Sequence, residues 1–361
     1  MEHDVYKRLA LHLDSLPSGF PATEEGVELR ILRHLFTPEQ AELAVHLRLK
    51  LEKAEDIAQR AGLTVEEVAP RLVEMARRGL IFSIEAPQRP PVYMAAQFII
   101  GIWEYNLNNL TPEFNRDMEA YMPHLSRTAF GVLPQLRTIP VGKSLAAAPE
   151  VLAYESVENL IRGQEKILVA PCICRKEHQM KGGGCGKLLE ACLVFGWGAD
   201  FYQRNGLGRV ISQDEALAIV AKAEEEGLVA QPSNAQEIVN ICLCCGDCCH
   251  ALANLKSHPA PARVVVSPFL ARLDSEACIG CEVCVDRCQM EALTMDGDKA
   301  VLNAERCIGC GLCVSTCAGE ALSLERKPEQ PQVPRNMIEA MTIRAQTRQG
   351  LAEKLARHQK L

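Results

Sequence analysis

The stretch CIGCEVCVDRCQMEAL at residues 278–293 is repeated as CIGCGLCVSTCAGEAL at residues 307–322. Each copy places four cysteines in the spacing C-x2-C-x2-C-x3-C, and the two copies are offset by 29 residues. This spacing is typical of iron–sulfur ligation, because three thiolates spaced by two residues form a tight loop around one corner of a 4Fe-4S cube. The loop cannot reach the fourth iron, so each cube needs a fourth ligand from elsewhere.

The two copies resemble the halves of a bacterial two-cluster 4Fe-4S ferredoxin domain, over about residues 267–327. In that family each repeat lends its fourth cysteine to the other cluster. Gln289 and Ala318 stand where the family usually has proline, so the resemblance does not fix loop rigidity or reduction potential. A zinc site and a purely structural cluster are the alternatives. The resemblance implies a cluster one bound by Cys278, Cys281, Cys284 and Cys317, and a cluster two bound by Cys307, Cys310, Cys313 and Cys288.

The composition is that of a globular chain with several domains, since 48% of its 361 residues are hydrophobic and 24% are charged. The longest apolar run, residues 92–103, is too short to cross a bilayer, and the first residues lack the pattern of a secretory signal. Seventeen cysteines in such a chain favour thiolates held by metal in a reducing compartment over disulfides. We therefore expect a cytoplasmic protein without a membrane span.

Negative charge is concentrated on the repeated segment. Residues 274–325 hold ten acidic side chains against Arg287, Lys299 and Arg306, a balance of −7 that equals the formal charge of the whole chain. Thiolate-bound clusters are also anionic, so this segment favours a basic patch on a redox partner protein and disfavours nucleic acid. A surface that is merely well solvated is the alternative.

Residues 1–95 contain no cysteine and are rich in helix signals. Apolar periodicity predicts helices over residues 4–16 and 25–36, and Thr37-Pro38-Glu39 predicts a third that runs to about Leu49. The next segment, AEDIAQRAGL, predicts a short helix. It is followed by a second helix, capped by Thr64 and Glu67, and by the strand-like LIFSIE. This order resembles a winged helix-turn-helix domain.

The winged-helix-like segment lacks a basic footprint for DNA. Its second helix would enter the major groove with Glu66 and Glu67 in its first turn, and Pro70 interrupts it. Between residues 53 and 82 five basic side chains are offset by five acidic ones. The sequence therefore favours a protein-docking or structural role over nucleic-acid binding.

Residues 96–262 form a cysteine-rich middle region. KILVAPC and LVAQPS read as strands, and Ser212 with Glu215 caps a helix to about Gly227, which predicts a small α/β layer. The glycine cluster GGGCGK does not fit a phosphate-binding loop, because Lys181 replaces the first glycine and Leu188 replaces the magnesium-binding Ser or Thr.

Nine further cysteines make the middle region a candidate for at least one more iron–sulfur centre. They could hold one cluster, two clusters, or a zinc ion with His178 or His250. Cys244-Cys245-Gly246 resembles the CCG motifs of heterodisulfide-reductase-type subunits, although the Cys-x-x-Cys that this family needs well downstream of the CCG occurs here only in the ferredoxin-like repeats. The whole segment resembles multi-cluster ferredoxin-like proteins of anaerobes. The candidate ligands are Cys172, Cys174, Cys185, Cys192, Cys242, Cys244, Cys245, Cys248 and Cys249.

Residues 328–361 begin with a linker stiffened by three prolines and end in a helix predicted from about Asn336 to the last residue. From Arg335 onward the sequence contains six Lys or Arg residues but only two acidic residues, Glu339 and Glu353. This basic helix could pack across the acidic segment of its own chain or dock on a partner subunit.

Together these patterns predict a multidomain α+β protein: a helical, winged-helix-like domain at 1–95, a small α/β cysteine-rich domain at 96–262, a two-cluster ferredoxin domain at 263–327, and a proline linker with a C-terminal helix at 328–361. We expect an electron-transfer protein that relays electrons between protein partners through two 4Fe-4S clusters and at least one middle-domain centre. The alternatives are a subunit of an anaerobic oxidoreductase with chemistry at that centre and a redox-sensing winged-helix regulator. A stand-alone enzyme is disfavoured, and the sequence identifies no small-molecule substrate.

Overall fold

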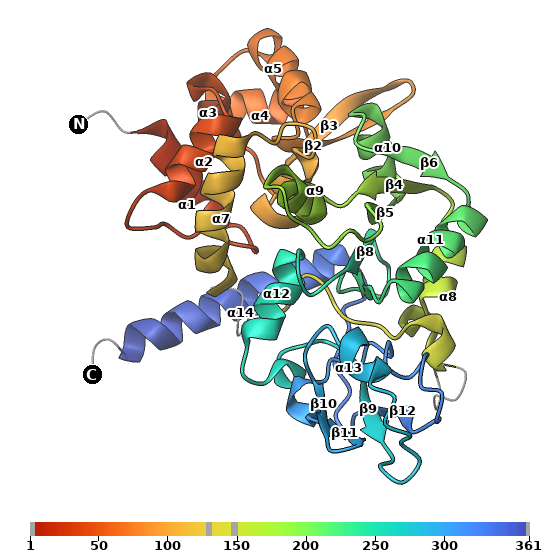
Figure 1. Cartoon of the computed structure of the whole chain (residues 1–361). Coiled ribbons are helices and arrows are strands. Elements are labelled where there is room, and N and C mark those ends of the chain that lie inside the picture. The colour runs from red at the N-terminus through yellow and green to blue at the C-terminus, as the bar shows by residue number, and fades with distance from the viewer. Residues whose placement is uncertain (1–3, 128–131, 146–150, 359–361) are drawn as a thin grey trace. The chain divides into compact units, whose positions relative to one another are not determined.

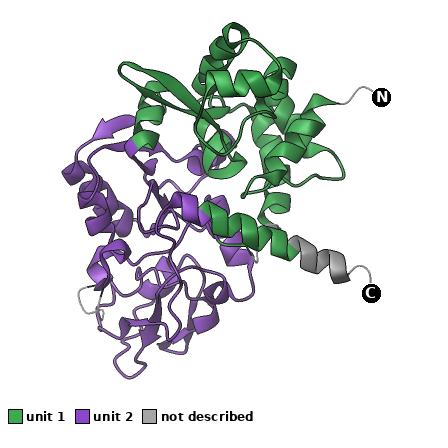
Figure 2. Cartoon of the chain, turned by 180° about the vertical axis from the view of Figure 1, so that it is seen from behind, with its two compact units in different colours: residues 1–133, 197–208, 341–361 green, residues 134–196, 209–340 purple. Residues whose placement is uncertain are grey.

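The computed structural model describes residues 4–127, 132–145 and 151–358 (Figure 1). The chain divides into two compact units, coloured separately in Figure 2. Unit 1 comprises residues 1–133, 197–208 and 341–361, and unit 2 comprises residues 134–196 and 209–340. In the described part of the chain, no helix has the length and apolar character needed to cross a membrane.

Helices of unit 1 begin and end where local sequence signals place them. The Thr37 and Thr64 side chains accept from the backbone N–H groups of Gln40 and Glu67, which return the bond, and Gly62 ends a helix with a left-handed φ of 67°. The helices are α1 (Val5–Ser15), α2 (Val27–Leu35), α3 (Pro38–Ala44), α4 (Ala54–Ala61), α5 (Val65–Arg77), α6 (Trp103–Tyr105), α7 (Pro112–Arg127) and α10 (Gly196–Arg204), with a π-helical turn, η1 (Phe98–Ile102).

The third helix is shorter than predicted, since α3 ends at Ala44 and not near Leu49. The carbonyl oxygens beyond α3 bond to other elements: the His46 carbonyl accepts from the Arg60 side chain and the Arg48 carbonyl accepts from Ala95 N–H at 2.8 Å. A helix through this segment would use those carbonyls internally.

A small antiparallel sheet follows the helices in the order β1-β3-β2. Ile81 of β2 pairs with Ala95 of β3, and the short β1 pairs with the other edge of β3. The core of unit 1 contains three aromatic rings that come from distant parts of the sequence. The centroid of the Phe20 ring lies 4.6 Å from that of Phe98 and 5.0 Å from that of Tyr121. The strands are β1 (Glu52–Lys53), β2 (Ile81–Ala86) and β3 (Arg89–Ala95).

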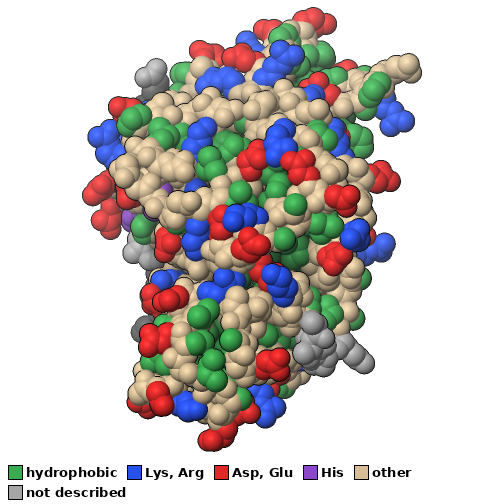
Figure 3. All heavy atoms as spheres, turned by 45° about the vertical axis from the view of Figure 1, so that its right-hand side comes forward, with side chains coloured by type: hydrophobic (Ala, Val, Ile, Leu, Met, Phe, Trp, Pro, Cys, Tyr) green, Lys and Arg blue, Asp and Glu red, His purple; other side chains and the backbone are tan. Residues whose placement is uncertain are grey.

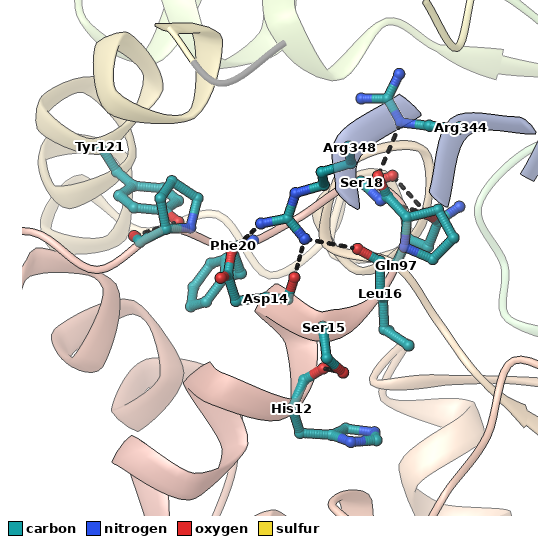
Figure 4. Close-up of polar contacts among 12 residues, drawn as sticks. His12, Asp14, Ser15, Leu16, Ser18, Phe20, Gln97, Tyr121, Arg344 and Arg348 are labelled. Carbon is teal, nitrogen blue, oxygen red and sulfur yellow. Dashed lines mark hydrogen bonds and ion pairs between the residues drawn. The ribbon is translucent and has the colours of Figure 1, made fainter. Parts of the chain in front are cut away.

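The C-terminal helix α14 (Met337–His358) is held within unit 1 by two arginines (Figure 4). Arg344 donates Nε–H to the Pro17 carbonyl at 3.1 Å and a second bond to the Leu133 carbonyl. Arg348 pairs with the Asp14 carboxylate at 2.5 Å and also donates to backbone carbonyls of that segment. Arg348 is thus bound to the N-terminal segment and not to the acidic one; the predicted helix residues 359–361 lie outside the described residues.

Replacing Arg344 with alanine should weaken the attachment of α14. The side chain is 7% exposed, and its loss leaves buried carbonyl oxygens without donors, so we expect destabilisation of about 2 kcal/mol. Urea unfolding followed by circular dichroism measures this. Arg335→Ala is the control, because that side chain is 78% exposed and its ion pair should contribute about 0–1 kcal/mol. Equal effects of the two substitutions would contradict the anchoring role.

Unit 2 contains a five-stranded sheet in the order β6-β4-β5-β8-β7, with every neighbouring pair antiparallel. Its apolar core includes Val169, Leu193 and Ile241 from the three central strands. The strands predicted at KILVAPC and LVAQPS are present. The elements are β4 (Ile167–Pro171), β5 (Glu190–Phe195), β6 (Arg209–Ile211), β7 (Val229–Pro232), β8 (Asn240–Cys244), α8 (Val157–Arg162), α9 (Ile173–Met180), α11 (Gln213–Glu225), α12 (His250–Ser257), η2 (Gly142–Leu145), η3 (Ala153–Glu155) and η4 (Pro261–Arg263).

The repeated segment folds in unit 2 as two short strand pairs around the cysteines. β9 (Phe269–Leu273) pairs with β12 (Leu322–Arg326), which closes the segment end to end, and β10 (Leu293–Asp296) pairs with β11 (Lys299–Leu302) between the repeats. One short helix, α13 (Val283–Arg287), and one turn, η5 (Ala304–Arg306), complete it. These short elements leave much of the backbone free to form the cysteine loops.

Candidate metal centres

The structure gathers the eight cysteines of the repeats around two hollows. One is lined by Cys278, Cys281 and Cys284 of the first repeat together with Cys317 of the second. The other is lined by Cys307, Cys310 and Cys313 of the second repeat together with Cys288 of the first. Each hollow therefore receives three sulfurs from one loop and a fourth from the other, which is the donor set that a 4Fe-4S cube needs.

Backbone N–H groups point at several of these sulfurs. Ala292 N–H donates to Cys288 Sγ at 3.2 Å, Ala271 N–H to Cys307 Sγ at 3.3 Å, and Ala300 N–H to Cys278 Sγ at 3.4 Å. Such bonds stabilise sulfur that carries negative charge. Those from the Ala300 and Gly280 backbone lower the pKa of Cys278. The backbone of the two loops therefore stabilises the negatively charged thiolate form of these cysteines.

The two hollows differ in exposure. Cys281 is the exposed cysteine of the first set, whereas Cys307 and Cys313 of the second set are buried. Burial raises the pKa of Cys310 to about 12 and raises that of Cys313 well above its usual range. Buried thiolates are costly without a counter-charge, so a bound metal would be the natural compensation in the second set.

Residues 271–324 match the family model of the 4Fe-4S dicluster domain. This segment is an iron–sulfur ferredoxin-type domain. The match covers a minor part of the chain and does not reach the middle region. Comparison with curated proteins and with solved structures gives no match.

Six of the nine middle-region cysteines form a closed ring of contacting thiols, which we call the six-thiol ring. Each sulfur is in hydrogen-bonding contact with two others, and Cys244 and Cys249 approach to 3.2 Å. Hydrogen bonds from Cys192 and Cys244 lower the pKa of Cys242 to about 5. In order around the ring the members are Cys172, Cys174, Cys249, Cys244, Cys242 and Cys192.

The sheet of unit 2 explains how distant residues meet in this ring. Cys242 and Cys244 are two residues apart on β8 and so lie on one face, and Cys192 of β5 is the cross-strand partner of Cys242. Cys172 and Cys249 occupy the N-cap positions of α9 and α12, where the helix N-terminus favours a thiolate. Cys174 lies in the first turn of α9, so secondary structure positions all six sulfurs.

The other three middle-region cysteines form a separate group, the three-thiol site. The sulfurs of Cys185, Cys245 and Cys248 all lie within 4.8 Å of one another, and Cys185 and Cys245 are 3.7 Å apart. Neighbours in the sequence thus divide between the two groups: Cys244 and Cys249 join the ring, while Cys245 and Cys248 turn into the core of the sheet. The structure separates what the sequence shows as one run of five cysteines.

Arg175 is a functional residue that the sequence analysis missed. The residue is 2% exposed, and its guanidinium donates to the Leu188 and Leu243 carbonyls at 2.8 Å and 2.9 Å. Burial lowers its pKa, but the charges of Cys172 and Cys245 and a bond to Cys185 outweigh burial and raise it. Arg175 therefore supplies positive charge to both thiol groups.

The histidines considered as zinc ligands contact a buried carboxylate and one another. His250 Nε2 is 2.6 Å from the buried Glu177 carboxylate, which also pairs with Lys181 at 3.1 Å, and the His178 ring lies beside that of His250 at 6.4 Å. Within the described residues, the tight group of ligand atoms that could hold a metal ion consists of cysteines alone. The structure gives no support for a histidine in the three-thiol site.

Proposed function

We propose that this chain is an electron-transfer protein with two 4Fe-4S clusters in residues 271–324 and at least one more iron–sulfur centre in the middle region. The observation that carries the proposal is the pair of hollows, each lined by three cysteines of one repeat and one of the other. Two cubes that exchange a ligand lie close together, as electron hopping requires. The role calls for no acid, base or nucleophile.

Cluster one is the proposed contact with a redox partner. Beside the exposed Cys281, the side chains of Ile279 and Val283 are 65% and 40% exposed. Figure 3 shows exposed hydrophobic side chains in the lower part of the view with Asp and Glu as well as some Lys and Arg around them, and the formal charge of residues 274–325 is −7. An apolar centre with an acidic rim suits a partner with a complementary basic rim.

Cluster two is the proposed contact with the middle region. Val141 N–H donates to the Cys310 carbonyl at 3.0 Å, and Arg306 donates to the Lys256 carbonyl at 3.1 Å. Cys307 and Cys313 also belong to the same apolar cluster as Cys244 and Cys249 of the six-thiol ring, as does Cys284 of cluster one. Electrons that leave cluster two would therefore meet protein-filled space and not bulk water on the way to the ring.

A hydrogen bond explains why glutamine, and not the family's proline, stands at position 289. It follows Cys288, and its Oε1 accepts from Gly246 N–H at 2.6 Å. A Cβ at position 246 would come within 2.8 Å of the Gln289 carbonyl, so the glycine permits this approach. One hydrogen bond thus connects a proposed cluster-two ligand with the Cys244-Cys245-Gly246 turn, and proline could not make it.

The experiment is a metal count with electron paramagnetic resonance on protein purified without oxygen. We expect brown protein with about eight irons per chain from the ferredoxin-type domain and about twelve if the six-thiol ring holds a further 4Fe-4S centre. In the Cys172→Ser/Cys244→Ser variant, iron should fall to about eight while the ferredoxin signals persist. Colourless, iron-poor wild type would refute the electron-transfer function; full iron in the variant would refute only the ring centre.

For the N-terminal region we propose a winged-helix-like domain with a docking or structural role. The element order β1, α4, α5, β2, β3 and the sheet order β1-β3-β2 support the fold assignment. Glu67 is bound to Thr64 at 2.9 Å, and Glu66 stands beside it in the first turn of α5. This acidic start disfavours DNA phosphate and base contacts.

A further inference from the structure

We propose that Cys185, Cys245 and Cys248 bind a single zinc ion with three thiolates and leave its fourth coordination position open to a small ligand from solution. The site would be separate from the six-thiol ring and would not transfer electrons. The inference does not depend on the proposed electron-transfer function, because it concerns a different metal on different cysteines.

The spacing of the sulfurs distinguishes a single ion from a cluster. Zinc binds thiolates at about 2.3 Å in tetrahedral geometry, so two sulfurs on one ion lie about 3.8 Å apart. Cys185 and Cys245 are 3.7 Å apart, and all three sulfurs fall within 4.8 Å. Cysteines of a 4Fe-4S cube bind different irons, so three of its ligands do not all lie this close to one another. Accordingly, among the described residues the eight ferredoxin-type cysteines form no such trio.

The donor set leaves one position unfilled. Among the described His, Cys, Asp and Glu side chains, no fourth ligand atom joins the trio. Structural zinc sites have four protein ligands, whereas sites that bind a water or a substrate have three. The arrangement therefore corresponds to the open type.

The glycine cluster around Cys185 makes this position accessible. Gly182, Gly184 and Gly186 all have positive φ, at 76°, 126° and 66°, a path that L side chains rarely adopt. The glycines on this turn are exposed, while Cys185 points inward and packs against the core of the sheet. GGGCGK, which does not fit a phosphate loop, thus forms an exposed turn without bulky side chains that carries one of the three ligands.

Arg175 balances the charge of such a site. Three thiolates and a divalent ion sum to one negative charge, and the guanidinium beside Cys185 and Cys245 supplies one positive charge. A metal that already carries three thiolates accepts a further soft donor, so we infer that the ligand is a small thiolate or, in its absence, water.

The test compares two variants of the full chain that lose the same number of cysteines. Wild type should contain about one zinc per chain. Cys185→Ser/Cys248→Ser should lose the zinc and keep the iron, whereas Cys172→Ser/Cys192→Ser should keep the zinc. Loss of iron from the first variant, or wild type without zinc, would overturn the proposal.

X-ray absorption at the zinc edge of the wild type gives a second measurement that needs no variant. We expect three sulfurs at about 2.3 Å and one nitrogen or oxygen at about 2.0–2.1 Å. Addition of mercaptoacetate should replace the light atom with a fourth sulfur. Four sulfurs before the addition, or an unchanged spectrum after it, would refute the open position.

Discussion

Removing Cys281 together with Cys317 should leave one of the two ferredoxin-type 4Fe-4S signals intact, whereas removing Cys281 together with Cys288 should leave neither of them. Cys281 and Cys317 line the same hollow, so the first double alanine variant loses two ligands of cluster one and spares cluster two. Cys288 lines the other hollow, so the second variant removes one ligand from each cluster. Iron analysis and electron paramagnetic resonance of the reduced proteins measure the difference.

The two variants control for each other because each lacks the exposed Cys281 and one partly buried cysteine. General damage to the fold would affect both, while exchanged ligands affect them differently. With ligands confined to their own repeats the outcome would be reversed: the Cys281/Cys288 variant would keep one cluster and the Cys281/Cys317 variant none. Cys281→Ala alone should retain the unperturbed signal of cluster two.

The ferredoxin-type domain could be predicted because its information is local. The distance between ligands is set by the C-x2-C-x2-C loop itself, and a second copy of the loop reveals the pairing. Helix ends could also be predicted from local sequence, since Thr64 and Glu67 form their capping box within four residues. Only α3 was wrong in length, because the carbonyls after Ala44 bond to elements distant in the sequence.

The division of the middle-region cysteines could not be predicted without the sheet. Cys192 meets Cys242 only through the register of β5 on β8, which is fixed by strands that the sequence does not align. One signal was available: Cys242 and Cys244 are two apart, and alternation along a strand separates them from Cys245. Arg175 gave no signal, because a buried arginine is recognised only by the charges that surround it.

Substituting Gly309 with alanine should destabilise the ferredoxin-type domain by about 3 kcal/mol or more and release cluster two. Gly309 has a φ of 69°, and a Cβ there would overlap the Phe269 carbonyl and come within 2.8 Å of Ser267 Oγ. Phe269 pairs with Arg326 where β9 meets β12, so relief of the overlap would separate the strands that close the domain. Loss of visible iron–sulfur absorbance during urea unfolding measures the effect.

Gly297→Ala is the matched control for Gly309→Ala. Gly297 also has a positive φ, 59°, but a Cβ there would meet nothing within 4 Å. The strain of the left-handed conformation alone costs about 1 kcal/mol, so this variant should keep both clusters and unfold at slightly lower urea. The difference between the two variants isolates the close approach of the second cysteine loop to β9. If both variants unfolded alike, backbone strain and not this approach would account for the glycine at position 309.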